Sequence, residues 1–261
     1  MTRSESEGDH MSATQIEVSP ESFDTPELSP HAELAFMARA LNREGYDDFN
    51  VGHITYRQPD ETFLILPADL GWDEARPGNA LRIDIDGNLL EGEGKLMPAV
   101  RLHLEYHRLH RGCIWAIHQH PWFATLWSTT GRIPPAYYQR AVHAIGGQIA
   151  VYDDHQGPVS GVDAARAAAA AMGDASVTLL RNHGVFVVGD DAGQAYSRAV
   201  GLERRCRMAW YAESLCGARE MPEAAQHAVS ELGRTKHGGR GPGLWEWAVR
   251  RELRADPALL S

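Results

Sequence analysis

The stretch Cys113-Ile114-Trp115-Ala116-Ile117-His118-Gln119-His120-Pro121 joins a short apolar run to two histidines that are two positions apart. The apolar run predicts a buried strand. Because successive side chains of a strand point to opposite faces, His118 and His120 share one face. Pro121 ends the strand, so the pair lies at an edge of the sheet where a pocket can open. Two neutral imidazoles on one face supply half of a metal site.

A third histidine stands in the stretch Leu180-Arg181-Asn182-His183-Gly184, where another apolar run ends. Gly184 permits close approach of the backbone at this point. Three histidines with an open position form a catalytic metal site, whereas a structural zinc site is closed by four protein ligands. The alternative for any single histidine is a hydrogen-bonded core residue. The combination of the two motifs favours a metal site over three core residues.

The segments around these motifs predict a chain of mixed α and β structure. Apolar runs and alternating patterns predict strands at residues 51–57, 62–67, 81–86, 113–118, 148–152, 176–181 and 184–188. Helical spacing predicts helices at residues 31–44, 99–111, 135–145, 162–172 and 192–216. Strands with helices on both sides predict an α/β fold, here a three-layer α/β/α sandwich. The connections are too short for many parallel crossovers, so we expect a mostly antiparallel central sheet.

The two ends of the chain differ from this pattern. Residues 1–30 are rich in Ser, Glu, Thr and Pro and are expected to form a flexible N-terminal arm. Residues 31–216 form the predicted domain. Residues 217–261 are expected to form a polar linker and a C-terminal helix, whose apolar side packs either on a neighbouring subunit or on its own domain.

Charge and composition disfavour several classes of protein. The chain has 261 residues, of which 25 are basic and 35 acidic, so its formal net charge is −10. A binder of nucleic acid or of an anionic membrane surface usually carries the opposite sign. Three cysteines without ligand spacing indicate a reducing compartment, and the apolar stretches are far shorter than the roughly 20 residues of a membrane helix. We therefore expect a cytoplasmic protein that acts on a small molecule.

The chain resembles the class II aldolase/adducin family over residues 30–216. The two histidine motifs carry most of this resemblance, and the other matching pieces are Gly52-His53-Ile54-Thr55-Tyr56-Arg57, Asp84-Ile85-Asp86-Gly87, Tyr152-Asp153-Asp154-His155-Gln156-Gly157 and Leu202-Glu203-Arg204-Arg205-Cys206. The resemblance implies an α/β/α sandwich, a homotetramer, and a site near a subunit interface. It also implies that His118, His120 and His183 are the ligands of a divalent metal ion, with Fe, Zn and Mn as the candidates.

Two departures from the family pattern bear on the reaction. The family's sugar-phosphate aldolases hold phosphate with a Gly-Asn-Val-Ser-like turn and a Pro-Ser-Ser-Glu-like turn, as anion sites generally do. Here these turns are Gly52-His53-Ile54-Thr55 and Leu96-Met97-Pro98-Ala99, so we expect a substrate without a sugar phosphate. The family's catalytic glutamate falls on Ala99, which can neither bind a metal nor move a proton. Another base is needed for aldol chemistry.

Six further residues are candidates for roles at the site. His103 follows Ala99 by one turn of the predicted helix and His155 lies in a loop near a strand end; both are catalytic candidates, with packing as the alternative. Family enzymes use a tyrosine of a neighbouring subunit as proton donor, and Tyr138 is the candidate here. The candidates for substrate binding, each able to bind a carboxylate, are His53, Arg101 and Arg181.

These features favour a metal-dependent enzyme that cleaves a carbon–carbon bond beside a carbonyl or carboxylate. Decarboxylation fits the missing glutamate, because no proton has to be removed before carbon dioxide leaves. The family includes decarboxylases of aromatic acids and non-haem iron oxygenases of aminocoumarin pathways, so an aromatic oxo acid and a reaction with Fe(II) and O2 are expected candidates. The alternatives are an aldolase or epimerase with a replacement base, and a non-catalytic adducin-like assembly module. Three convergent histidines argue against the assembly module.

Overall fold

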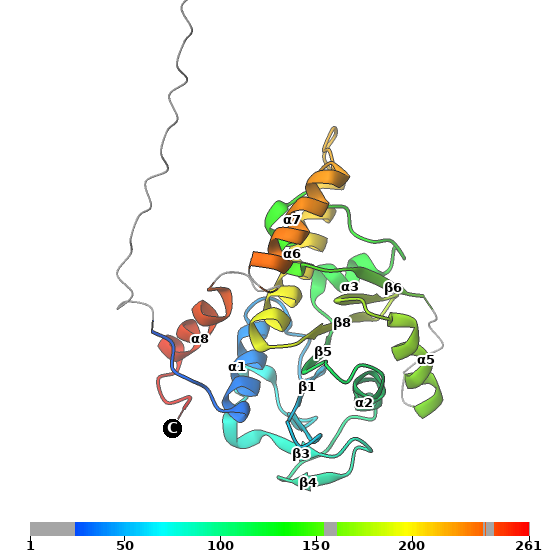
Figure 1. Cartoon of the computed structure of the whole chain (residues 1–261). Helices are drawn as coiled ribbons and strands as arrows, with labels where there is room; N and C mark the ends of the chain where they lie inside the picture. The colour runs from blue at the N-terminus through cyan, green and yellow to red at the C-terminus, as the bar shows by residue number, and fades with distance from the viewer. Residues whose placement is uncertain (1–23, 154–160, 237, 239–242, 261) are drawn as a thin grey trace, which may run out of the picture.

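The computed structural model describes residues 24–153, 161–236, 238 and 243–260 (Figure 1). Its centre is one eight-stranded sheet with the order β4-β3-β2-β1-β5-β8-β7-β6. The strands are β1 (His53–Arg57), β2 (Phe63–Ile65), β3 (Leu81–Ile83), β4 (Leu89–Glu91), β5 (Trp115–Gln119), β6 (Ile149–Tyr152), β7 (Val177–Leu180) and β8 (Gly184–Gly189). The predicted strands therefore all form, and β1 pairs with β2, and β3 with β4, as antiparallel neighbours.

The sheet is mixed, which qualifies the expectation of a mostly antiparallel sheet. Strands β6 and β7 run parallel, and the other neighbouring pairs are antiparallel. The cause lies in the connection between β6 and β7, which contains the helix α5 (Val162–Met172). A crossover with a helix is long enough to return the chain in the same direction, whereas a tight turn is not.

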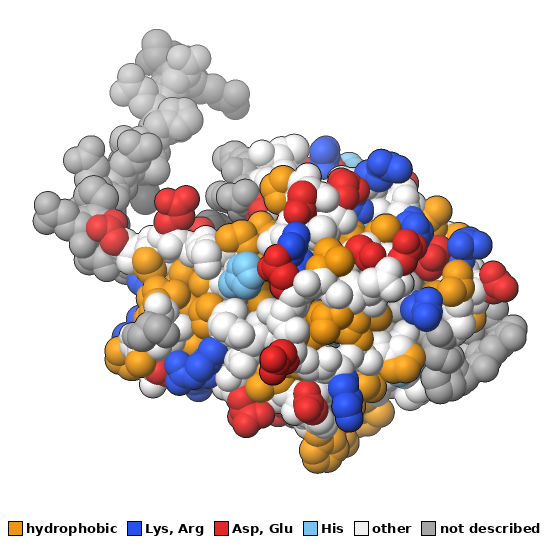
Figure 2. Space-filling model, turned by 90° about the horizontal axis from the view of Figure 1, so that it is seen from below, with side chains coloured by type: hydrophobic (Ala, Val, Ile, Leu, Met, Phe, Trp, Pro, Cys, Tyr) orange, Lys and Arg blue, Asp and Glu red, His pale blue; other side chains and the backbone are white. Residues whose placement is uncertain are grey.

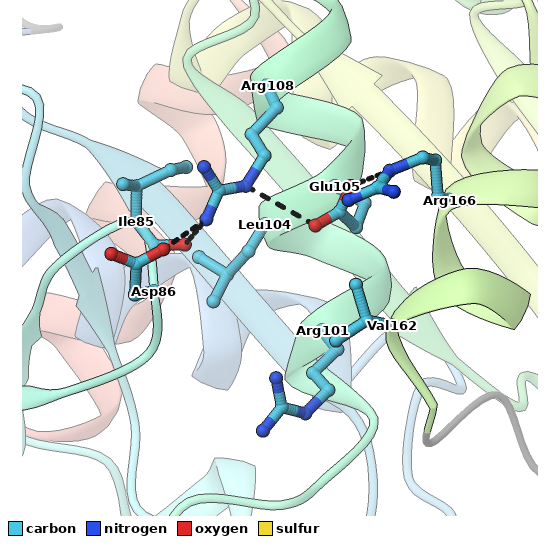
Figure 3. A pocket seen from close by; sticks show the side chains of 8 residues that line it. All are labelled: Ile85, Asp86, Arg101, Leu104, Glu105, Arg108, Val162 and Arg166. Carbon is cyan, nitrogen blue, oxygen red and sulfur yellow. Dashed lines mark hydrogen bonds and ion pairs between the residues drawn. The ribbon is translucent and has the colours of Figure 1, made fainter.

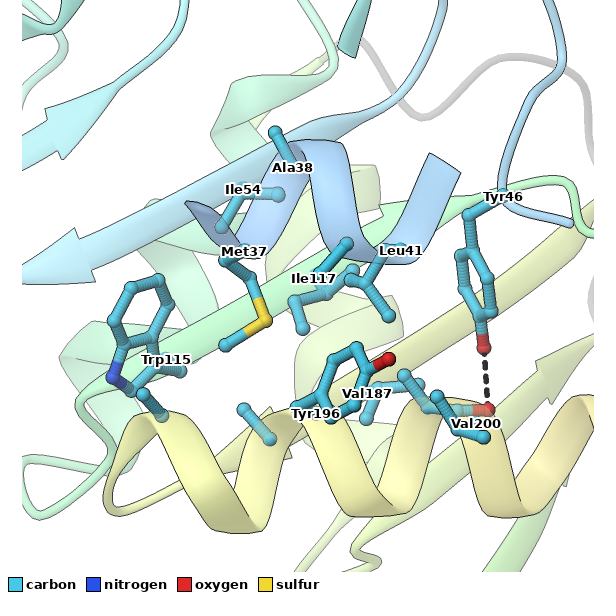
Figure 4. Close-up of a cluster of buried hydrophobic side chains, with 14 of the residues drawn as sticks. Met37, Ala38, Leu41, Tyr46, Ile54, Trp115, Ile117, Val187, Tyr196 and Val200 are labelled. Atoms are coloured by element: carbon cyan, nitrogen blue, oxygen red, sulfur yellow. Dashed lines mark hydrogen bonds between the residues drawn. The ribbon is translucent and has the colours of Figure 1, made fainter. Parts of the chain in front are cut away.

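Helices cover both faces of this sheet. On one face lie α1 (Pro30–Asn42), α6 (Ala192–Glu213) and α8 (Leu244–Ala255), and on the other lie α2 (Val100–Leu109) and α5. Figure 4 shows Met37 of α1, Ile117 of β5 and Tyr196 of α6 in the core of the first face. The adjacent strand residue Ala116 packs on the opposite side, in the cluster that includes Leu102 of α2. This alternation places His118, two residues after Ala116, on the α2 side of the sheet.

The remaining helices are short or peripheral. They are α3 (Trp122–Ser128), α4 (Gln139–Ile145), α7 (Glu223–Lys236) and the 3-10 turns η2 (Trp72–Glu74) and η3 (Pro77–Asn79). The helix predicted at residues 135–145 begins four residues later, after Pro134-Pro135. The α3 helix has seven residues and no predicted counterpart, because it is too short for a periodic pattern to show.

The segment expected as a polar linker contains the helix α7, which the sequence pattern did not predict. The α7 sequence Glu-Ala-Ala-Gln-His-Ala-Val is rich in helix formers. The helix packs against α4, where Gly233 comes so close that a Cβ atom would lie 2.4 Å from the carbonyl oxygen of His143. This polar segment therefore forms a helix in the folded protein, because one side of it packs closely against α4.

The C-terminal helix α8 docks on its own chain. Glu252 of α8 is fully buried and forms ion pairs with Arg43, which follows α1, and with Arg251. Trp245 of α8 packs against Tyr196 of α6, with ring centroids 5.6 Å apart. Of the two alternatives for this helix, the structure therefore supports packing on its own domain.

The surface carries charges of both signs. Figure 2 shows acidic and basic side chains interspersed over the face seen from below. Among the described residues, no helix is both long enough and apolar enough to cross a bilayer.

Candidate metal centre

The structure brings the three predicted ligands together. One ring nitrogen of each of His118, His120 and His183 lies within 4.8 Å of one ring nitrogen of each of the other two. His118 and His120 come from the end of β5, and His183 comes from the turn between β7 and β8. Strands β5 and β8 are antiparallel neighbours, with His118 opposite Phe186, so the end of β5 meets the start of β8. Two motifs far apart in sequence therefore form one group.

Two of the rings are oriented by hydrogen bonds through Nδ1. In His118, Nδ1 lies 2.8 Å from the carbonyl oxygen of Val185; in His120, it lies 2.8 Å from Oδ2 of Asp48. Both partners accept hydrogen bonds, so Nδ1 carries the proton in each ring and Nε2 presents a lone pair. Nε2 of His120 is buried and has no hydrogen-bond partner. This arrangement is the one that metal-binding histidines use, and the residues present fit a metal ion.

Burial keeps the imidazoles of His118 and His53 neutral. It lowers the pKa of His118 well below its usual value, and the neighbouring histidines lower it further. His53 is 7% exposed, and burial lowers its pKa to about 4. A metal ion binds the neutral imidazole, so ligands that resist protonation retain the ion under mildly acidic conditions.

The backbone around the group is tightly packed. A Cβ atom on Gly184 would lie 2.6 Å from the carbonyl oxygen of Gln119, so a glycine is needed for β8 to approach β5. Asn182 has a φ of 56°, in the left-handed region, which turns the chain so that His183 faces the pair. The Gln119 side chain donates to the carbonyl oxygen of Val51 at 2.9 Å and accepts from the N–H of His120. These contacts fix the end of β5.

His53 lies beside the three histidines. It is opposite His118 in the β1–β5 pairing, and the two rings stack with centroids 5.8 Å apart and an interplanar angle of 15°. Both of its ring nitrogens are buried and have no hydrogen-bond partner. A neutral imidazole offers one donor and one acceptor, so His53 is equipped to bind a polar group of a ligand at this site.

His103 lies behind His53 and away from solvent. Its ring meets that of His53 edge to face, with centroids 5.8 Å apart, and it is fully buried. Its Nδ1 lies 3.0 Å from Oγ1 of Thr55, which also lies 2.9 Å from Nε2 of His107. This environment matches the packing alternative more closely than a catalytic role in contact with substrate.

The remaining predicted residues have other contacts or surroundings, or lie outside the described residues. Arg181 forms a double hydrogen bond with Asp153 at 2.7 and 2.6 Å, so its charge is already paired. Arg101 lines a separate cavity of about 300 Å³ beside Glu105 and Arg108 (Figure 3). Tyr138 is half-buried at the start of α4. His155 lies outside the described residues.

The aromatic residues near β5 mainly belong to the core. Trp115 and Trp127 are buried, and Phe123 packs against the same cluster. Trp122 is 73% exposed. This aromatic set therefore belongs to the core, with Trp122 as the exception.

Sequence reasoning missed the residues that hold the ligands. Asp48 lies 72 positions before His120, and neither spacing nor a motif connects the two. The signal for Gln119 is stronger, because it stands between the two histidines and points to the other face of β5, where a polar residue needs partners.

The eight-stranded α/β fold and the three-histidine group together define a protein of the class II aldolase type. The family model described as Class II Aldolase and Adducin N-terminal domain matches residues 32–210. The chain therefore belongs to the class II aldolase and adducin family. Enzymes of this class typically depend on a divalent metal ion, and the three histidines are the described residues that would hold it.

The chain is similar to three proteins over most of its length. An aldolase II superfamily protein from Pseudomonas syringae has a TM-score of 0.77 and 25% identity, over 94% of this chain and 98% of that one. L-fuculose 1-phosphate aldolase from Glaciozyma antarctica PI12 has a TM-score of 0.75 and 18% identity, over 90% and 96%. The third is 4-hydroxy-3-prenylphenylpyruvate oxygenase/4-hydroxy-3-prenylbenzoate synthase from Streptomyces roseochromogenus subsp. oscitans. It is 27% identical over 205 residues, which cover 76% of this chain and 74% of the relative.

Proposed function

We propose that this protein is a metal-dependent decarboxylase that breaks the carbon–carbon bond beside the carboxylate of a non-phosphorylated, aromatic oxo acid. The observation that carries the proposal is the composition of the site. Three histidines converge there, and within the described part of the chain no carboxylate belongs to the group. Ala99 stands where the family pattern leads us to expect the catalytic glutamate.

The missing glutamate bears on the type of reaction. Aldol cleavage and epimerisation need a group that removes a proton from the substrate, and an alanine cannot do so. In a decarboxylation the departing carbon dioxide leaves its bonding electron pair behind, so no base is required before the bond breaks. An alanine at position 99 is therefore compatible with decarboxylation without any replacement residue.

The chain's own residues would bind and orient the substrate. His118, His120 and His183 would hold a divalent ion, which when bound supplies Lewis-acid stabilisation for negative charge on substrate oxygens. The neutral ring of His53, unpartnered at both nitrogens, would donate a hydrogen bond to the substrate carboxylate or carbonyl. The buried surroundings of His53 and His118 keep water away from their rings and strengthen such a bond.

The similarity to the Streptomyces oxygenase supports an oxygen-dependent form of the reaction. That protein is named an oxygenase of an arylpyruvate, which is an aromatic 2-oxo acid. We propose the same substrate class here, with Fe(II) as the metal that the three histidines would hold and O2 as the co-substrate of the reaction. Removal of O2 should then abolish turnover.

We also propose that the active form is a homotetramer. Trp210 and Tyr211, near the end of α6, are 49% and 50% exposed. Large aromatic side chains exposed next to one another are typical of interaction surfaces. The family resemblance provides the expected number of subunits.

The proposal is tested with the purified chain after loading with Fe2+, Zn2+ or Mn2+. We expect carbon dioxide release and O2 uptake from an aromatic 2-oxo acid with the Fe2+ form. His118→Ala should lose metal binding and activity together, because it removes the most buried ligand.

Several outcomes would contradict the proposal. Cleavage of a sugar phosphate, with no reaction of oxo acids, would favour the aldolase or epimerase alternative. A chain that retains no metal under any condition would favour the non-catalytic assembly module. Full activity in His118→Ala would show that the site lies elsewhere.

A further inference from the structure

After His120 the chain continues into α3. The residue at the N-cap of this helix, Pro121, provides no side-chain hydrogen bond. The first N–H groups of any helix lack partners within the helix and need acceptors from elsewhere. The N–H groups of Phe123 and Ala124 therefore depend on another part of the molecule.

Glu203 of α6 supplies both acceptors. Its Oε1 accepts from the N–H of Phe123 at 3.0 Å, and its Oε2 accepts from the N–H of Ala124 at 2.8 Å. The Glu203 residue is 7% exposed. A carboxylate taken out of water to this extent is costly unless its hydrogen bonds are made, so these two bonds constrain both segments.

The Glu203 carboxylate also lies close to the loop that contains Asp48, the residue whose side chain orients the His120 ring. A Cβ atom built on Gly45 would lie 3.9 Å from Oε1 of Glu203. Three residues later in this loop, Asp48 accepts from Nδ1 of His120. Tyr46 lies between Gly45 and Asp48 in the sequence. Its hydroxyl donates to the carbonyl oxygen of Ala199 on α6 at 2.8 Å. The α6 helix therefore supports both segments that flank His120.

We propose that Glu203 is a positioning residue for the metal centre, because its carboxylate holds the backbone that follows His120 and keeps Nε2 of His120 in place for the ion. The inference rests on the three-histidine site of the proposed function. Glu203 itself touches neither metal nor substrate. Its effect passes along the backbone from Phe123 through Trp122 and Pro121 to His120.

The test compares Glu203→Gln with wild type by Co2+ titration, followed by the visible absorption of the bound ion. The glutamine keeps the size of the side chain, but its NH2 group faces one of the two N–H donors and cannot accept. We expect metal affinity to fall by about tenfold, within the range found when groups behind metal ligands are altered. Hydrogen exchange at the amides of Phe123 and Ala124 should become faster in the same variant.

A matched control removes a helix cap far from the site. Asp191 accepts from the N–H of Gln194 at 2.9 Å at the start of α6, beyond the end of β8 that is remote from His183. Asp191→Ala should lower thermal stability and leave Co2+ affinity unchanged. If Glu203 had a purely structural role, Glu203→Gln would likewise lower thermal stability and leave Co2+ affinity unchanged.

The outcomes separate this inference from the proposed function. Wild-type Co2+ affinity in Glu203→Gln overturns the inference and leaves the proposed function intact. A wild-type chain that binds no Co2+ overturns both. A tenfold loss of affinity supports the inference, even if the loaded enzyme proves inactive towards oxo acids. Glu203→Ala, if it folds, should lose more affinity than Glu203→Gln.

Discussion

His118 lies near the end of β5 and His120 directly follows this strand, yet different kinds of group orient the two rings. The acceptor for His118 is a backbone carbonyl, which no substitution removes, whereas the acceptor for His120 is the side chain of Asp48. The carboxylate also raises the electron density of the ring that it holds, which strengthens its Nε2 as a ligand. At the scale of single residues, His120 is therefore the predicted ligand whose orientation a single substitution can disturb.

Replacement of Asp48 tests this difference. We expect Asp48→Ala to weaken metal binding by about 10- to 100-fold, because the His120 ring loses the acceptor that fixes its orientation and its proton. Metal content and Co2+ titration measure the change. The adjacent, exposed Asp47 offers a matched control, since Asp47→Ala removes the same charge. Equal losses in both variants would show that net charge, and not the hydrogen bond, is responsible.

Buried histidines also make stability depend on pH. Burial, with a smaller contribution from the Arg57 charge, lowers the pKa of His107 to about 3 from an ordinary value of 6.5. The unfolded chain therefore takes up a proton at a higher pH than the folded chain does. The stabilisation from a neutral His107 is fully present above pH 6.5 and is lost as the pH falls towards 3.

His107→Gln should therefore make unfolding less sensitive to acid. One such proton contributes about 1.4 kcal/mol per pH unit to the slope of the unfolding free energy. Urea denaturation at pH 7 and pH 5 should show a smaller loss of free energy in the variant than in wild type. Identical losses would mean that His107 does not titrate differently in the two states.

At the scale of elements, α8 is held by a buried charge. Glu252 lies 2.8 Å from Arg43 and 3.3 Å from Arg251, and it also faces Arg39 at 3.8 Å. Its carboxylate is fully buried, whereas Arg43 is 44% exposed. The helix is amphipathic, so its apolar residues pack on α6 while Glu252 joins it to α1.

Glu252→Gln should loosen this helix. We expect the free energy of unfolding to fall by about 1.5–3 kcal/mol, since hydrogen bonds to a charged group are lost. Glu246→Gln removes a charge from the first turn of the same helix and serves as the control. A loss that changes with protein concentration would indicate instead that α8 docks on a neighbouring subunit.

At the scale of the whole molecule, the proposed tetramer bears on the proposed site, because a neighbouring subunit would supply the hydroxyl of Tyr138 to it. Light scattering should give four times the 28.8 kDa of one chain. Tyr138→Phe should lower kcat by about 10²-fold with little effect on metal affinity, if a neighbouring subunit supplies this hydroxyl as a proton donor. A monomer with full activity would contradict both expectations.

Patterns among residues that are close in sequence account for the parts of the fold and of the site that could be predicted. The alternation of a strand placed His118 and His120 on one face, and a glycine after His183 marked a close turn. Most strands and helices followed from patterns within about ten residues. These features depend on neighbours along the chain, so the chain alone specifies them.

The partners that make the site work depended on tertiary structure. Asp48 meets His120 across 72 positions, and Glu203 meets Phe123 across 80. The parallel pairing of β6 with β7 and the order in α7 likewise arise from packing between distant segments. The family and the group of three histidines could be predicted from the sequence alone, because spacing within a strand and a turn is local. The fold decided which groups orient those ligands, because a hydrogen bond between distant segments forms only where packing brings them together.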